Sequence, residues 1–256
     1  EAKPMIAEPI EAAVFEDCTY FPLENRIRSG STFSYLSVDY KQDDFLALTS
    51  ETFSGFVYGG QIDYERFSQS GLYALLQTNF LTGKLDEKHD IARLRVFESI
   101  SKLCMGYSYT ALQGERFRAT PYLGLGFTFF SEKAQEDLFH EQTEYFTIFL
   151  PVGFLVQYAA LDWVHLGFNL EWFPDLDTTV QSETEDKLRY VLSRSTGQFL
   201  VELPTEFHLT EHYSLQIVPF WKRIKTKKFV SEERPLIIPE KRRIYWGGQM
   251  HLCLLF

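Results

Sequence analysis

The chain has 256 residues, of which 45% are hydrophobic and 16% aromatic, and its formal net charge is −10. This charge disfavours a nucleic-acid-binding function, because phosphate recognition requires clustered Lys and Arg. The sequence contains no apolar run of about 18 residues or more, which excludes a membrane-spanning helix but not membrane-spanning strands, whose signal is weak in each segment.

Residues 1–28 form the first predicted unit. They contain Pro4, Pro9 and Pro22 and show no sustained alternation, so we expect an extended N-terminal segment before the main folded unit at 29–256. Because the chain starts at Glu1 rather than Met, we also expect a mature form whose secretory signal peptide has been removed.

Alternation of apolar and polar residues, which is typical of β-strands, persists through the rest of the chain. In 91–100, the apolar residues Leu94 and Val96 alternate with Arg93 and Arg95. Pro121, Pro151, Pro204 and Pro219 fall within alternating segments, and we expect bulges or strand ends at some of them. The strands are predicted near 55–64, 72–80, 91–100, 103–111, 117–129, 145–158, 164–172, 199–209, 213–221 and 246–256.

The links between these segments differ in length. Those near 159–162 and 210–212 are short, whereas 131–144, 174–196 and 226–242 are long. Short periplasmic turns and long outer loops are typical of outer-membrane barrels, whose strand number is even in single-chain bacterial proteins. With the alternating residues between 29 and 54, the ten ranges above make about eleven segments, so we predict about 12 strands, with 10 as the alternative and a hidden strand at 44–50 or within 9–21.

The last strand carries an apolar residue at every second position and ends on an aromatic one, in the series Met250, Leu252, Leu254 and Phe256. It resembles the closing strand of bacterial outer-membrane β-barrels. The segment 120–126, Thr-Pro-Tyr-Leu-Gly-Leu-Gly, is similar to the Pro-Tyr-x-Gly-x-Gly strand of small barrels of the OmpA, OmpW and opacity-protein type. The resemblance implies an all-β, antiparallel up-and-down transmembrane barrel at 29–256 in a bacterial outer membrane, whose terminal series is the insertion signal for the barrel-assembly machinery. Residues 1–28 would then be an N-terminal periplasmic or lumen-plugging segment.

A soluble β-sandwich or lipocalin-like barrel is the alternative fold, because alternation does not reveal which face is inside. We favour the membrane barrel, since the second parity repeatedly carries Gly, Arg, Glu and His, which suit a polar interior. Charged side chains on these positions cannot face lipid, where Arg or Lys costs roughly 2–4 kcal/mol. The predicted lumen-lining residues are Arg93, Arg95, Arg118, His165, Glu171, Glu202, Glu206, His208, Lys222 and His251.

Three functions remain open on the sequence. The first prediction is a narrow porin or channel for passive diffusion of small polar solutes or ions, and the alternative is a closed barrel in which lumen charges of both signs form an ion-pair network. The closed barrel would have a structural, adhesin or envelope-integrity role through its outer loops. A lipid hydrolase is a distant third hypothesis, for which His212 and Ser214 are the one pair considered.

Neither a cofactor nor a metal site is predicted. Cys18, Cys104 and Cys253 fit no metal-ligand spacing, and their odd number leaves one thiol for a disulfide-linked partner. Outer-membrane lipids are the expected surroundings, and lipopolysaccharide phosphates are an expected partner of the last long loop. That loop carries Lys225, Lys227, Lys228, Arg234, Lys241, Arg242 and Arg243.

Overall fold

A computed structural model describes residues 25–44, 47–68, 70–88, 92–111, 116–134, 142–182, 188–192, 196–227, 229–230, 237–238 and 240–256. Every regular element of these ranges is a β-strand. None of them contains a helix that could span a membrane. Most of the predicted segment 1–28, including Cys18, lies outside the described residues, although 25–28 already belong to the first strand.

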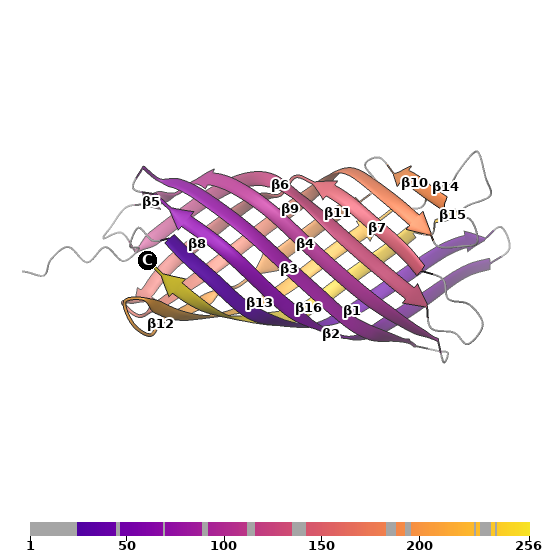
Figure 1. Ribbon diagram of the computed structural model, residues 1–256, viewed down its shortest axis with the longest axis horizontal. Helices are drawn as coiled ribbons and strands as arrows, with labels where there is room; N and C mark the ends of the chain where they lie inside the picture. Colours follow the sequence, from indigo (N-terminus) through magenta and orange to yellow (C-terminus); the bar gives the residue numbers. More distant parts are fainter. Residues whose placement is uncertain are drawn as a thin grey trace, which may run out of the picture.

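Ten strand positions form a closed antiparallel barrel, which lies horizontally in Figure 1. Single strands fill seven positions: β1 (Asn25–Asp44), β2 (Ala47–Phe67), β3 (Leu72–Glu87), β6 (Phe117–Ala134), β9 (Val164–Ser182), β13 (Tyr213–Thr226) and β16 (Glu240–Leu255). Paired segments fill three: β4 (Arg93–Tyr107) with β5 (Tyr109–Ala111), β7 (Gln142–Phe149) with β8 (Val152–Leu161), and β11 (Thr196–Glu202) with β12 (Thr205–His208). Three further strands are β10 (Leu188–Leu192), which pairs with β9, and the hairpin of β14 (Phe229–Val230) and β15 (Ile237–Ile238).

The barrel closes between its first and last strands. β1 pairs with β2 on one side and with β16 on the other, and Asn25 and Phe256 exchange two backbone hydrogen bonds of 3.0 and 2.9 Å. Closure leaves no unpaired edge, which a barrel in lipid requires.

The two ends of the barrel differ. The links at 68–71, 162–163 and 209–212 are short and lie at the end that holds the C-terminus, on the left in Figure 1, which we call the turn end. The opposite loop end carries the predicted long links. β6, β9 and β16 extend into these links, so that much of 131–144, 174–196 and 226–242 is strand rather than loop.

The strand number is ten, the smaller of the two numbers that the sequence allowed. The segments 91–100 and 103–111 belong to one wall position, β4 with β5, which the sequence counted twice. The strand β1 lies before all the predicted ranges and was missed. The region 44–50 adds no separate strand among the described residues, because Asp44 ends β1 and 47–50 begin β2. The other candidate region, 9–21, lies outside the described residues.

The reason for the double count is a reversal of polarity along β4. Even-numbered residues face the interior throughout the strand, from Leu94 to Cys104. Near the loop end these inward residues are apolar and the outward ones are Arg93 and Arg95, whereas near the turn end the outward residues, such as Met105, are apolar. In the sequence, the apolar residues of this one strand therefore change from even-numbered to odd-numbered positions, which gives the appearance of two separate strands.

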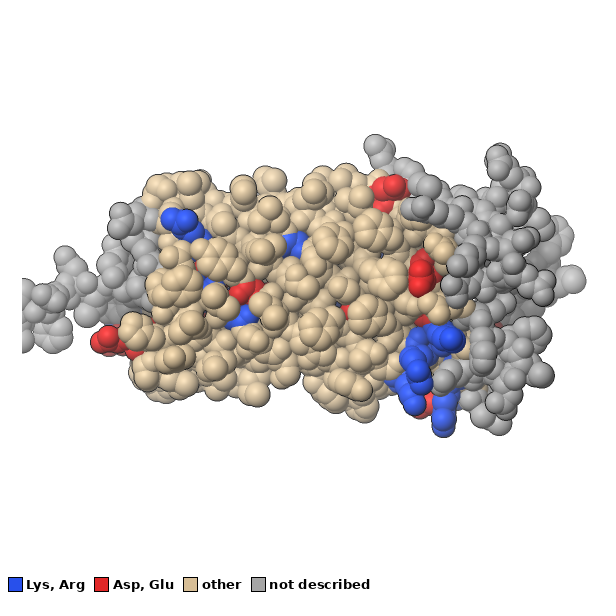
Figure 2. Space-filling view, viewed as in Figure 1, with Lys and Arg blue, Asp and Glu red and all other residues tan. Residues whose placement is uncertain are grey.

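Around the middle and the turn end, the outer surface of the barrel is apolar. Leu252, Leu254 and Phe168 are 55%, 40% and 40% exposed, and Figure 2 shows a largely uncharged middle with Lys and Arg gathered at the loop end. A soluble barrel would bury these side chains, so the lipid-facing orientation is confirmed. Exposed aromatic residues flank the apolar surface, as the girdles of membrane barrels do: Tyr107, Tyr109, Tyr158, Trp163, Tyr213 and Phe256 at the turn end, and Tyr35, Phe56, Tyr58, Phe97 and Trp246 towards the loop end.

Between the second girdle and the loop end, the barrel has polar residues on its outer face and apolar residues inside, as a soluble protein does. β1 and β2 are 20 and 21 residues long, about twice the 9–11 that cross a bilayer. The prediction that Arg93 and Arg95 line the lumen is wrong, because both are exposed on the outside here and Arg93 pairs with Asp86 at 3.3 Å. The interior at this level is a hydrophobic core that includes Leu36, Val38, Phe53, Val57, Leu81, Leu85, Leu94, Val96, Phe130, Tyr145, Val180, Phe220, Ile224 and Tyr245.

The four prolines behave in two ways. Pro151 separates β7 from β8 and Pro204 separates β11 from β12, as expected for a residue that cannot donate to the sheet. Pro121 and Pro219 instead lie inside β6 and β13.

Gly153 makes room for a side chain that crosses the lumen. Tyr122 is its partner on β6, and a Cβ at position 153 would lie 2.2 Å from Tyr122 Cζ. Only glycine lets the ring lie against the wall here.

We therefore expect Gly153→Ala to displace Tyr122 and to lower the free energy of unfolding by about 1–3 kcal/mol, the usual cost of overpacking. Gly197→Ala is the matched control, because a Cβ at this strand position meets nothing within 4 Å. Urea unfolding followed by tryptophan fluorescence measures both variants. Equal unfolding midpoints for the two would contradict the assignment.

Candidate functional site

The lumen is the candidate site, and charged side chains cross it at three levels. At the turn end, Arg26 of β1 contacts Glu65 of β2 at 2.9 Å and Glu206 of β12 at 2.8 Å. Arg28 contacts Asp63 at 3.1 Å and Glu65 at 3.5 Å. These side chains are almost fully buried, so each charge depends on its partners rather than on solvent.

The middle level joins strands that are not neighbours in the barrel wall. Lys102 of β4 forms a buried ion pair with Glu171 of β9. Beside it, Tyr122 donates to Asn169 at 2.8 Å, and Asn169 donates to Glu202 at 2.8 Å. The polar groups at this level hold one another across the lumen.

The third level lies against the hydrophobic core. Glu98 of β4 accepts from Lys222 of β13 at 3.1 Å and from Arg243 of β16 at 3.2 Å. The Arg243 guanidinium also stacks on the ring of Phe130, 3.9 Å from its centroid. Because aromatic rings attract cations, core and ion pairs form one continuous packing.

Glu132 anchors a second cluster at this level. Its carboxylate pairs with Lys241 and accepts hydrogen bonds from the hydroxyl groups of Tyr40, at 2.7 Å, and Tyr145, at 3.2 Å. All of these groups turn towards the interior, so the loop end of the lumen is filled by side chains.

Within the part of the chain that the structure describes, two small cavities lie among these side chains. Each has a volume of about 50 Å³, and they share the lining residues Gln61, Gln77, Lys102, Glu202 and Gln249. Such volumes hold a few water molecules but not a solute.

The structure places eight of the ten predicted lumen residues inside the barrel: Arg118, His165, Glu171, Glu202, Glu206, His208, Lys222 and His251. Most of their partners were missed. Lys102 and Asp63 were on the predicted polar faces and could have been found, but Arg26 and Arg28 lay in the presumed N-terminal segment. Lys241 and Arg243 lay in the presumed outer loop.

The expected basic outer loop is therefore only partly an outer feature. Lys241 and Arg243 are buried in the lumen, and Lys225 is paired with Glu240 at 3.0 Å. Lys228 and Arg234 lie outside the described residues. The thiols of Cys104 and Cys253 are free and buried.

The pair considered for hydrolysis is not assembled. His212 is exposed in the turn before β13, whereas Ser214 is buried and donates to Glu206 at 2.6 Å. His212 and Ser214 do not share a strand face, because β13 begins only at Tyr213.

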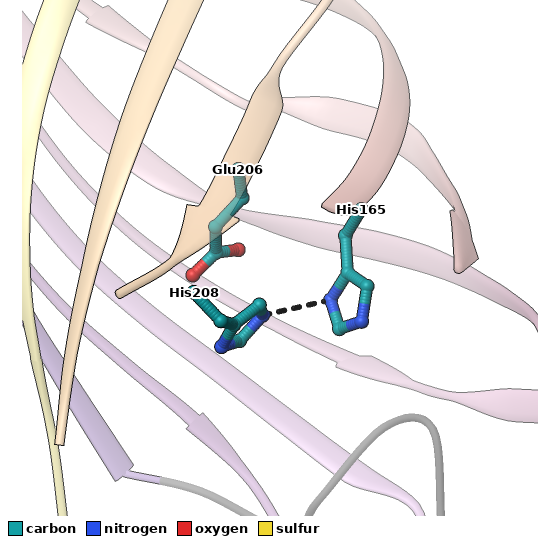
Figure 3. A group of neighbouring side chains, drawn as sticks. All are labelled: His165, Glu206 and His208. Carbon is teal, nitrogen blue, oxygen red and sulfur yellow. Dashed lines mark hydrogen bonds between the residues drawn. The ribbon is translucent and has the colours of Figure 1, made fainter. Parts of the chain in front are cut away.

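A different group of side chains lies at the turn end, shown in Figure 3. His165 of β9 is directly opposite Glu206 of β12, and His208 follows two residues later on the same face. The Nε2 atom of His208 lies 3.1 Å from Nδ1 of His165. One ligand atom from each of the three residues lies within 4.8 Å of the others.

No family model and no curated protein matches this sequence. Among solved structures, the chain is similar to the outer membrane protease OmpT from Escherichia coli, with a TM-score of 0.60, 9% identity, and coverage of 90% of this chain and 97% of that one. It also matches OprG from Pseudomonas aeruginosa, with a TM-score of 0.42, 8% identity and coverage of 93% and 98%. A major outer membrane protein from Thermus thermophilus matches with a TM-score of 0.40 and 13% identity, and the match covers 86% of this chain and 98% of that one.

At this identity the similarity to OmpT shows the fold alone, and the two weaker matches carry no further argument. The fold is that of bacterial outer-membrane β-barrels, as the last strand and the Pro-Tyr-x-Gly-x-Gly strand predicted. The predicted location in a bacterial outer membrane agrees with this fold and with the apolar outer surface.

The central ion pair gives a test of the lumen network. Lys102→Met leaves the fully buried carboxylate of Glu171 without its cation, and we expect a loss of about 3–5 kcal/mol in the free energy of unfolding. The double variant Lys102→Met with Glu171→Gln removes both charges and should recover most of this loss. Denaturant unfolding measures all three proteins.

Arg93→Ala is the control for loss of an ion pair as such, since its side chain is 63% exposed and its pair with Asp86 is solvated. Arg93→Ala should change the denaturant concentration at the unfolding midpoint only slightly. If Lys102→Met were as mild as Arg93→Ala, the buried pair would not support the barrel as described.

Proposed function

We propose that this chain is a closed barrel that acts through its outer part, in a structural or envelope-integrity role, rather than a porin. The observation that carries this proposal is the filled lumen: three levels of ion pairs and a hydrophobic core lie in series along the axis. A porin needs a continuous aqueous path, and the two small cavities among the described residues do not supply one.

Energetics support the same proposal. An ion moving through the lumen would have to separate buried partners, and leaving one buried charge unpaired costs roughly 3–5 kcal/mol. At the loop end it would then meet apolar side chains that offer no substitute for its hydration shell. The narrow-channel hypothesis therefore requires a large rearrangement of side chains.

A closed barrel is expected to conduct no ions across planar bilayers. Purified barrel reconstituted at increasing protein concentration should give no discrete conductance steps, and proteoliposomes should not swell in small polar solutes. Heat-modifiable migration of the reconstituted protein checks that it is folded. Uniform conductance steps whose frequency rises with protein concentration would refute the closed barrel and restore the porin hypothesis.

A row of cations on the outer surface supports an envelope role. Lys84, Arg95 and Lys133 come from β3, β4 and β6, face outwards and are direct neighbours in the sheet register. The adjacent outward position towards the bilayer is Phe97, a residue of the aromatic girdle. The row therefore lies just above the apolar surface, at the level of lipid headgroup phosphates.

We expect the triple variant Lys84→Gln, Arg95→Gln and Lys133→Gln to bind lipopolysaccharide at least about tenfold more weakly, because it lacks three adjacent positive charges. Binding to the detergent-solubilised barrel is measured by native mass spectrometry at two salt concentrations. The matched control is Arg223→Gln with Lys225→Gln, two exposed cations of β13. Equal binding by both variants would exclude the row as the contact.

A further inference from the structure

The group at the turn end has the donors of a metal site. His165 and His208 offer imidazole nitrogens and Glu206 a carboxylate, the ligand types that hold Zn²⁺ and similar divalent ions in proteins. Two imidazoles favour such borderline ions over Ca²⁺ or Mg²⁺, which prefer oxygen donors.

The spacing of the donors fits one ion. Two nitrogens bound tetrahedrally to Zn²⁺ at about 2.0–2.1 Å lie about 3.3 Å apart. Nε2 of His208 and Nδ1 of His165 are 3.1 Å apart, so a small adjustment admits the ion between them. The carboxylate of Glu206 lies on the same inner face, and its ligand atom is within 4.8 Å of both.

The surroundings hold the carboxylate in place. Glu206 accepts from Arg26 at 2.8 Å through one oxygen and from Ser214 at 2.6 Å through the other. A carboxylate has about four lone-pair sites, so each oxygen keeps one for coordination. Arg26 is itself shared with Glu65, which offsets part of its charge near an incoming cation.

The site is accessible from solvent, and a bound ion would also have a structural role. His208 is only half-buried and directly precedes the short turn at 209–212, which lies at the turn end of the barrel. Strand β12 is the segment separated from β11 at Leu203 and Pro204, so an ion shared by β9 and β12 would fasten the wall beside this interruption.

We propose that His165, Glu206 and His208 bind one Zn²⁺-class divalent ion, with a fourth position left to solvent at the turn end. To bind the metal, both facing nitrogens must be unprotonated, so that each can donate its lone pair. The imidazole that now donates between the two rings therefore moves its proton to its other ring nitrogen, and the two neutral rings release no proton.

The test uses untagged full-length barrel in detergent, titrated with Zn²⁺ alone by calorimetry and with Co²⁺ alone by visible absorption. We expect one ion per barrel, intense tetrahedral-type Co²⁺ bands that Zn²⁺ abolishes, and a thermal unfolding midpoint that rises with Zn²⁺ concentration. His165→Ala and His208→Ala should each weaken Zn²⁺ binding at least about tenfold. Heat-modifiable migration confirms that the variants are folded.

His212→Ala is the matched control, because His212 is exposed in the neighbouring turn and outside the group. It should bind Zn²⁺ as the parent does. The proposal is overturned by absence of one-to-one binding, by weak octahedral-type Co²⁺ bands only, or by loss of binding in His212→Ala but not in His208→Ala.

Discussion

Charges on the inner wall of this barrel must find their partners across the lumen, and the rest of the structure depends on that constraint. The space between the walls is too narrow for bulk water, so an unpaired Arg or Glu would keep its full desolvation cost. Arg26, Lys102 and Arg243 each reach a carboxylate on a distant strand. These bridges tie non-adjacent strands to one another, and the two cavities among the described residues have room for a few water molecules rather than for a solute.

The outer face of the same strands lies in lipid near the turn end and in water near the loop end. Near the turn end the outward face meets lipid and is apolar, while the inward face is charged. Near the loop end the outward face carries Lys84 and Arg95, and the inward face is the hydrophobic core around Leu85 and Phe130. In β4 the even-numbered residues face inward throughout, and only the composition of the two faces changes. The hydrophobic effect therefore acts outside the barrel in the membrane and inside it above the membrane.

This reversal explains how much the sequence could reveal. Most strands other than β1 were predictable, because period-two alternation needs no knowledge of tertiary contacts. The lipid-facing side was predictable only because the other face repeatedly carries Gly, Arg, Glu and His. Arg93 and Arg95 were misplaced because charged residues were assumed to face inwards at every level. The partners of Glu98 were not predictable, since Lys222 and Arg243 follow it by more than a hundred residues and meet it only after closure. The group of His165, Glu206 and His208 likewise depends on the register of β9 with β12, which alternation does not specify.

The native thiols test the sealed lumen most directly. Cys104 and Cys253 are both buried in the barrel, and Cys104 packs with Tyr73 and Tyr122. Proteoliposomes are treated with a small, charged, water-soluble thiol reagent, and mass spectrometry locates the modified residues. A closed lumen predicts that Cys104 and Cys253 stay unmodified until the barrel is unfolded by heating in detergent. Rapid modification of either thiol in the folded barrel would contradict it.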